Sequence, residues 1–221
     1  MVDPDLRSRL RGLSDAASAK GDPLSWFEEL YDLASGDDAL IPWSRGRAHP
    51  ALIPWLDRTK FSGRALVVGC GLGEDAIALA DRGWRVTAFD LSATAVAWAA
   101  SLAGDRDIEW IVADLLKPPQ EWIGAFDLVL EVHILQAIPE RARHRAAKVL
   151  PKLVASNGHL VCIGRLASSD DGPPDGPPWP LTESYLRSVG QGLDLIRLDR
   201  ITLEGEPTDS RYLMHRRRQD P

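Results

Sequence analysis

The residues of this chain best suited to chemistry are a glycine-rich turn and a carboxylate that follows it. The turn, Gly69-Cys-Gly71-Leu-Gly73, comes directly after the apolar run 65–68. Glycine lets a backbone turn tightly and lets a ligand approach its N–H groups, which suits a phosphate, a carboxylate or a nucleoside. Asp90 ends the next apolar run, at the distance from the turn expected of an acid that binds a ribose hydroxyl.

Three further polar side chains follow later apolar runs. Asp114 comes after the run 108–113, and Glu131 and His133 stand at the end of the run 125–131. Asp114 can accept a hydrogen bond from an exocyclic amine such as that of adenine, or it can cap a turn. Glu131 and His133 are expected to point into the ligand crevice. His133 is a candidate base or substrate contact because imidazole changes charge near neutral pH, and a hydrogen-bonded structural residue is the alternative.

Alternating strand and helix patterns must position these residues. Short apolar runs typical of buried strands occupy 64–69, 85–90, 108–113, 125–131 and 158–165. Helical patterns occupy 74–82, 93–103 and 139–155, and two further strand patterns occupy 193–199 and 209–216. This alternation predicts an α/β chain with a single Rossmann-like, doubly wound and mostly parallel seven-stranded sheet. The last two strands are expected to form a hairpin-like pair.

The first sixty residues have a helical pattern instead. Asp22 and Pro23 suit the N-cap and first position of a helix whose apolar face continues to Gly36. We therefore expect a helical N-terminal lid over residues 1–60 and a core over residues 61–221.

These motifs together resemble those of the thiopurine and halide/thiol methyltransferase superfamily. The stretch 65–75 and Phe89-Asp90-Leu91-Ser92 resemble its glycine turn and ribose motif. Ile41-Pro-Trp43-Ser-Arg-Gly46 resembles its Thr-Pro-Trp-Asp-x-Gly segment, and Gly176-Pro-Pro-Trp179 resembles its Gly-Pro-Pro-Phe loop. The similarity runs from about residue 26 to about residue 185.

The resemblance implies a class I methyltransferase fold with S-adenosylmethionine as the methyl donor. It implies transfer to a small-molecule acceptor, above all a thiol or a related soft nucleophile. The cofactor-binding residues that it implies are Trp26, Trp43, Gly69, Gly71, Gly73, Asp90, Leu91, Asp114, Leu115 and Glu131. Glu131 and His133 are also the candidate catalytic residues, needed as a base if the acceptor atom is oxygen rather than a thiolate.

The chain departs from the family pattern where it lies nearest the acceptor. Ser44 replaces the acid that follows the tryptophan of the entry segment, and Val132-His133 replaces Tyr-Thr. Cofactor binding is therefore expected to transfer from the family more safely than the identity of the acceptor.

Two other functions share the glycine turn and Asp90. An NAD(P)-dependent oxidoreductase normally has a Tyr-x-x-x-Lys pair or a second catalytic domain, whereas here Tyr185 is followed by Val189 and the chain is short. A non-catalytic S-adenosylmethionine-binding protein would keep the fold without turnover. Both functions remain alternatives to a methyltransferase on the sequence alone.

Composition limits the remaining classes. The chain has 221 residues, a formal net charge of −6 and two cysteines. Such charge argues against nucleic-acid or anionic-membrane partners, and two cysteines build neither a disulfide framework nor a metal cluster. There is no long apolar run and no apolar signal region at the start, so we expect a cytoplasmic protein. We expect no bound metal, and a monomer, with a weak homodimer as the alternative.

Overall fold

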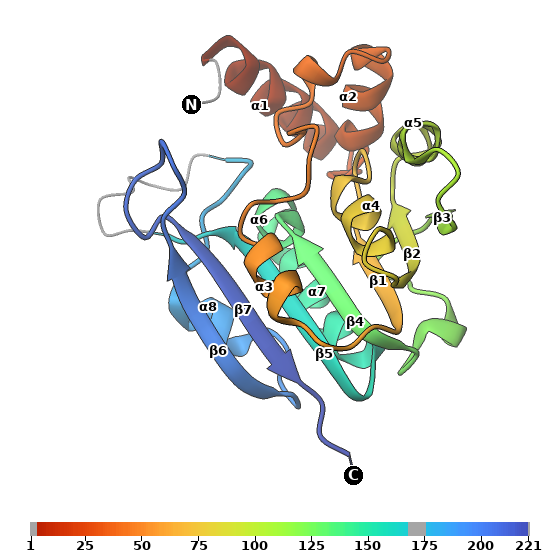
Figure 1. Ribbon diagram of the computed structural model, residues 1–221. Coiled ribbons are helices and arrows are strands. Elements are labelled where there is room, and N and C mark those ends of the chain that lie inside the picture. The colour runs from red at the N-terminus through yellow and green to blue at the C-terminus, as the bar shows by residue number, and fades with distance from the viewer. Residues whose placement is uncertain (1–3, 168–175, 221) are drawn as a thin grey trace.

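Seven strands form one sheet in a computed structural model that describes residues 4–167 and 176–220 (Figure 1). The strand order is β3-β2-β1-β4-β5-β7-β6. The strands are β1 (Arg64–Val68), β2 (Arg85–Asp90), β3 (Ile108–Val112), β4 (Phe126–Val132), β5 (Val154–Arg165), β6 (Asp194–Ile201) and β7 (Arg211–Arg217). Strands β1 to β5 pair in parallel, while β7 is antiparallel to both β5 and β6. The predicted α/β class, mostly parallel sheet and terminal hairpin are confirmed.

The strand register brings the predicted site residues to one edge of the sheet. Val68 pairs with Phe89 on one side and with Glu131 on the other, and Asp90 pairs with Val112. The glycine turn and the segments after β2, β3 and β4 therefore all leave the sheet at its carboxyl edge. In open α/β sheets this is the edge at which ligands bind.

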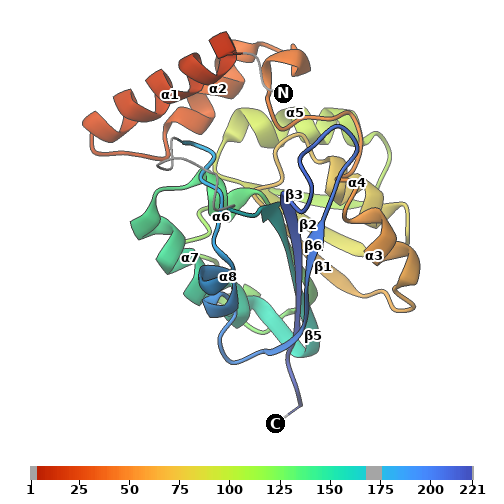
Figure 2. The same ribbon diagram turned by 90° about the vertical axis from the view of Figure 1, so that its left-hand side faces the viewer.

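Helices cover both faces of the sheet (Figure 2). One face carries α3 (Ile53–Arg58), α4 (Glu74–Ala80) and α5 (Ala93–Ala103), and the other carries α6 (Ile134–Ala137), α7 (Glu140–Leu153) and α8 (Glu183–Ser188). Ala65 and Val67 belong to the core on the α4 face, whereas Leu66 and Val68 belong to the core on the α7 face. The strands are nearly continuous apolar runs because both of their faces are buried.

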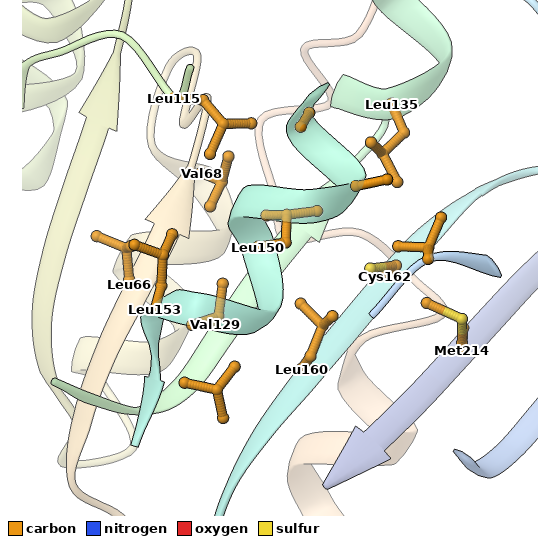
Figure 3. Close-up of a cluster of buried hydrophobic side chains, with 14 of the residues drawn as sticks. Leu66, Val68, Leu115, Val129, Leu135, Leu150, Leu153, Leu160, Cys162 and Met214 are labelled. Carbon is orange, nitrogen blue, oxygen red and sulfur yellow. The ribbon is translucent and has the colours of Figure 1, made fainter. Parts of the chain in front are cut away.

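The α7 face shows how side chains hold this helix on the sheet. Leu150 and Leu153 of α7 pack against Leu66, Val129 and Leu160 of three neighbouring strands (Figure 3). All five side chains are fully buried. Burying one such leucine contributes about 1.5–3 kcal/mol relative to leaving it in water.

The N-terminal helices α1 (Pro4–Ala19) and α2 (Trp26–Ala34) lie beyond the carboxyl edge of the sheet (Figure 1). The predicted helix start at Asp22 is wrong: residues 22–25 form turns and α2 begins at Trp26. The N–H of Asp22 bonds to the carbonyl of Ala17, so this residue completes the end of α1 instead of opening α2. A short 3-10 helix, Asp38–Leu40, follows. Whether residues 1–60 open and close as a lid stays a prediction.

Element boundaries differ from the predictions by a few residues, with two larger differences. Strand β5 starts at Val154, four residues earlier than expected, because the chain passes straight from α7 into the strand. The four-residue helix α6 was not predicted. Within the described ranges, every helix is too short or too polar to cross a lipid bilayer.

Candidate active site at the carboxyl edge of the sheet

A cavity of about 480 Å³ opens at the carboxyl edge of the sheet. The glycine turn, the ends of β2 and β4, the helix α2, the segment 42–49 and the prolines at 177, 178 and 180 all contribute to its wall. The predicted site residues on this wall are Trp26, Trp43, Gly69, Gly71, Asp90, Leu91, Asp114, Leu115 and His133. Gly73 and Glu131 are not among the described residues that line it.

The glycine turn shapes the cavity floor because all three glycines have a left-handed backbone, with φ of 58°, 53° and 81°. A Cβ on Gly69 would collide with Ile134 of α6, and one on Gly71 would lie 3.0 Å from the hydroxyl of Tyr31. A Cβ on Gly73 would collide with the ring of Trp110. Gly69 and Gly71 line the cavity, whereas Gly73 is absent from its described lining and supports the turn through packing.

Asp90 ties this turn to the end of β2. Its Oδ2 accepts from the N–H of Gly71 at 2.9 Å and its Oδ1 accepts from the N–H of Ser92 at 3.0 Å. Burial raises the pKa of Asp90, and these N–H donors act against that rise. Each carboxylate oxygen has a second lone pair, so the residue can still accept from a ligand hydroxyl. The ribose role is compatible with this geometry and stays a prediction.

Asp114 has the local role that the sequence left open. Its Oδ1 accepts from the N–H of Leu116 at 2.8 Å, which is an Asx turn. The residue also lines the cavity beside Leu115. The turn is thus present, and the predicted adenine contact stays a prediction.

An aromatic wall faces the glycine turn from the N-terminal segment. The rings of Trp26 and Phe27 stack with centroids 4.1 Å apart, and Trp43 lies edge-on to both at 6.1 Å. The Nε1–H of Trp43 donates to the hydroxyl of Tyr31 at 2.8 Å. The Nε1 of Trp26 is buried and has no hydrogen-bond partner among the described residues. Phe27 and Tyr31 were missed as site residues because helical spacing does not reveal which way a helix faces.

Two carboxylates of α4 anchor the segment that carries Trp43. Oε1 of Glu74 accepts from the hydroxyl of Ser44 and from the N–H groups of Arg45 and Gly46, at 2.7–2.9 Å. Oδ1 of Asp75 accepts from the N–H of His49 at 2.8 Å, and burial raises the pKa of Asp75 to about 6. The donor and acceptor residues of these hydrogen bonds lie 26–30 residues apart in sequence, so no local sequence pattern predicted them.

His133 and His49 form a pair of imidazoles on the cavity wall. Their ring centroids are 5.0 Å apart with the planes at 72°. Burial, together with the positive charges of Arg45 and Arg211, lowers the pKa of His49 to about 2 and that of His133 to about 3. Both rings are therefore neutral near pH 7, which makes His133 a weak base. His49 was not singled out by the sequence, since nothing local distinguishes it.

Glu131 lies behind the wall, so the expectation that it points into the crevice is wrong. Side chains alternate along β4, and this alternation turns Glu131 toward the α7 face. It is fully buried, its Oε1 accepts from the N–H of Leu135 at 3.0 Å, and its Oε2 has no partner among the described residues. Burial raises the pKa of Glu131 to about 7. The residue closes the first turn of α6 and does not reach the cavity.

Trp179 also lies away from the cavity, although its loop contributes prolines to the wall. The N–H of Trp179 donates to the carbonyl of Gln136 at 2.7 Å, and the guanidinium of Arg143 lies 5.6 Å from the centroid of its ring. A cation–π contact is thus present, but the cation is an arginine of the protein.

Four arginines line the cavity: Arg45, Arg47, Arg165 and Arg211. Arg45, Arg165 and Arg211 form what we call the arginine end, since the charges of all three act on Glu206. Glu206 binds the guanidinium of Arg211 through both carboxylate oxygens. Sequence reasoning missed this cluster because its members come from three separate parts of the chain, namely 45–47, 165 and 211. This arginine end lies on the side of His49 and His133, since the charges of Arg45 and Arg211 act on both rings.

Comparison with known proteins identifies similar sequences and folds. The sequence model of the family described as thiopurine S-methyltransferase matches residues 37–192. Thiocyanate methyltransferase 1 of Brassica oleracea is 30% identical over 159 residues, which are 69% of this chain and 68% of the relative. A 2-heptyl-1-hydroxyquinolin-4(1H)-one methyltransferase of Mycobacteroides abscessus is 24% identical over 67% of this chain and 66% of the relative.

Among solved structures, the N-methyltransferase NodS of Bradyrhizobium japonicum in complex with S-adenosyl-L-homocysteine has the same fold. Its TM-score is 0.66 at 19% identity, over 87% of this chain and 100% of that chain. With the family match, this favours a methyltransferase over the two alternatives, an NAD(P)-dependent oxidoreductase and a non-catalytic binding protein.

Proposed function

Because the chain belongs to the thiopurine S-methyltransferase family and is an S-adenosylmethionine-dependent methyltransferase, we propose that it methylates the sulfur of a small thiol bound as the thiolate. The observation that carries the proposal is the arginine end of the cavity, which faces two imidazoles held neutral. Such surroundings favour an anionic acceptor over a neutral one.

The residues of the cavity fit the methyl donor. Asp90 offers carboxylate lone pairs, Gly71 leaves the backbone approachable, and the unpartnered Nε1–H of Trp26 offers a buried donor. We propose that Trp26, Trp43, Gly69, Gly71, Asp90, Leu91, Asp114 and Leu115 hold the cofactor, with Gly73 supporting the turn from below. When bound, S-adenosylmethionine supplies a methyl group already activated by the sulfonium, so a thiolate sulfur takes the methyl and S-adenosylhomocysteine leaves.

The chain itself supplies charge, alignment and a dry cavity. A free thiol has a pKa of about 8.5, and nearby guanidinium groups shift the bound thiol toward the thiolate. A thiolate has no proton to lose during the transfer, so no residue has to act as a base. The aromatic wall of Trp26, Phe27 and Trp43 excludes water, and holding the two reactants in line is the main source of rate acceleration.

The N-terminal segment is proposed to act as the lid of this cavity. Its aromatic residues line the wall, and Glu74 and Asp75 hold the segment 44–49 on α4. Burial of Asp75 and its single bond to His49 make this anchor a candidate point of release when substrates exchange.

The test is the pH dependence of kcat/KM for two thiols of different acidity, with S-adenosylhomocysteine formation as the readout. kcat/KM reports the pKa values of the free enzyme and the free substrate, so the rising limb should follow the pKa of each thiol. Because His49 and His133 stay neutral, no limb near pH 6.5 is expected. A limb that stays at one pH for both thiols would refute thiolate binding, and turnover of phenols or halides without turnover of thiols would refute the acceptor class.

A further inference from the structure

We infer that the acceptor carries a carboxylate in addition to its thiol, and that Arg165 and Arg45, with His49, bind this second anionic group. The inference rests on the proposed function, since it adds a recognition group to the same acceptor.

The guanidinium groups at the arginine end outnumber the carboxylates that bind them. Arg211 is held by Glu206. Within residues 4–167 and 176–220, the guanidinium groups of Arg45, Arg47 and Arg165 make no ion pair and no hydrogen bond, although all three residues line the cavity. A guanidinium presents a planar fork of donors that matches the two oxygens of a carboxylate. A thiolate is a single soft atom and leaves such a fork unused.

Two buried imidazole nitrogens beside the arginine end have no hydrogen-bond partner among the described residues. Nδ1 of His49 accepts from the N–H of Ala51 at 3.2 Å, and a neutral ring with an accepting Nδ1 carries its proton on Nε2. This Nε2–H is closed to solvent and has no partner among the described residues, and the side chain lines the cavity with only 3% of His49 exposed. Nδ1 of His133 is likewise closed and unpartnered. Buried polar atoms are normally satisfied, so these two indicate a missing polar ligand.

The positions of His133 and Arg165 along the cavity indicate where the two ends of the acceptor would lie. His133 directly precedes Ile134, whose side chain packs over Gly69 of the glycine turn, so His133 lies on the methyl-donor side. Arg165 pairs with Arg211 in the register between β5 and β7, and the charges of both arginines act on Glu206. Arg165 therefore lies beside Arg211 and Glu206 at the arginine end. A thiolate beside His133 and a carboxylate near Arg165, Arg45 and the Nε2–H of His49 fit these positions.

The experiment compares 3-mercaptopropionate with its methyl ester, which keeps the thiol and removes the negative charge. A charge-assisted hydrogen-bond pair predicts that kcat/KM favours the carboxylate by about 10- to 100-fold, mostly through KM. Arg165→Gln should bring this ratio toward one. Arg165→Lys keeps the charge without the fork and should give an intermediate ratio. Arg85→Gln, at an exposed position at the start of β2, is the matched control and should keep the wild-type ratio.

A binding measurement separates this inference from the proposed function. Calorimetric titration of 3-(methylsulfanyl)propionate and its methyl ester into the S-adenosylhomocysteine complex needs no turnover, and the carboxylate should bind about 10-fold or more tightly. Equal affinities, or a ratio lowered no more by Arg165→Gln than by Arg85→Gln, would overturn the carboxylate site. Methylation of both thiols with equal efficiency also overturns it while leaving the proposed function standing. If neither thiol is methylated, the proposed function fails, and the titration alone decides the carboxylate site.

Discussion

Replacing Asp90 by asparagine should weaken cofactor binding as well as the fold. Both carboxylate oxygens accept backbone N–H groups, at 2.9 Å from Gly71 and 3.0 Å from Ser92, in a position only 8% exposed. Asparagine keeps one accepting oxygen and turns an NH₂ group toward the other N–H. One buried donor is left unpaired, which costs about 1–3 kcal/mol of the free energy of unfolding without ligand.

The effect on the ligand adds to this loss. If the ribose hydroxyls donate to Asp90, the substitution replaces a charged acceptor by a neutral one, and each lost charge-assisted bond is worth about 1.5–3 kcal/mol. The Kd for S-adenosylhomocysteine should therefore rise by about 10- to 100-fold. Isothermal titration calorimetry gives this Kd, and urea unfolding of the ligand-free protein gives the loss in the fold.

A matched control is Asp57→Asn, which removes an exposed carboxylate that pairs with Arg82 on the surface. It should change neither the Kd nor the free energy of unfolding by more than about 0.5 kcal/mol. The reasoning is refuted if Asp90→Asn destabilises the ligand-free protein as expected and yet binds S-adenosylhomocysteine with an affinity within about twofold of the wild type. Asp90 would then hold the turn without touching the ribose.

Two further predictions concern buried residues around the site. The pKa of Glu131 is raised from 4.5 to about 7, so between these pH values the native state holds a proton that the unfolded state releases. The stability that this residue contributes is therefore fully present below pH 4.5 and is lost as pH rises to about 7. The free energy of unfolding of Glu131→Gln, relative to that of the wild type, should therefore rise by up to about 3 kcal/mol from pH 5 to pH 8, as measured by urea unfolding. The same difference between the two proteins at both pH values would contradict this. Gly73→Ala should cost about 1–3 kcal/mol more than Gly83→Ala in thermal or urea unfolding, because both have φ near 81° but only the first meets Trp110. Equal losses would show that the Trp110 contact relaxes freely.

Much of the fold was predictable because buried parallel strands leave a clear signal. The run 85–90 and the helix 93–103 match their predicted bounds, since apolar residues fill the strand and Ser92 caps the helix through its hydroxyl. The start of α2 was not predictable in the same way. Asp22 and Pro23 carry a good local capping signal, but the hydrogen bond from Asp22 to Ala17 on the preceding helix overrides it.

The candidate site likewise contains residues that local sequence predicted and residues that it did not. The glycine turn and Asp90 were found because residues close in sequence build them. Glu131 was placed wrongly, because the crevice needs a particular side of β4 and strand ends do not reveal which side each residue faces. His49 and the arginines were missed because they come from separate segments and form a cluster only after the chain folds.

The sequence by itself determined the α/β class, the carboxyl edge as the ligand edge and the glycine turn with Asp90, because each depends on short-range patterns of apolar and small residues. Only the tertiary structure decided the electrostatics of the acceptor side. In the folded chain the ring centroids of His49 and His133 lie 5.0 Å apart, both rings are buried, and the charges of Arg45 and Arg211 act on them. Charge and burial act through space rather than along the chain, so the pKa values that favour a thiolate acceptor exist only in the folded protein.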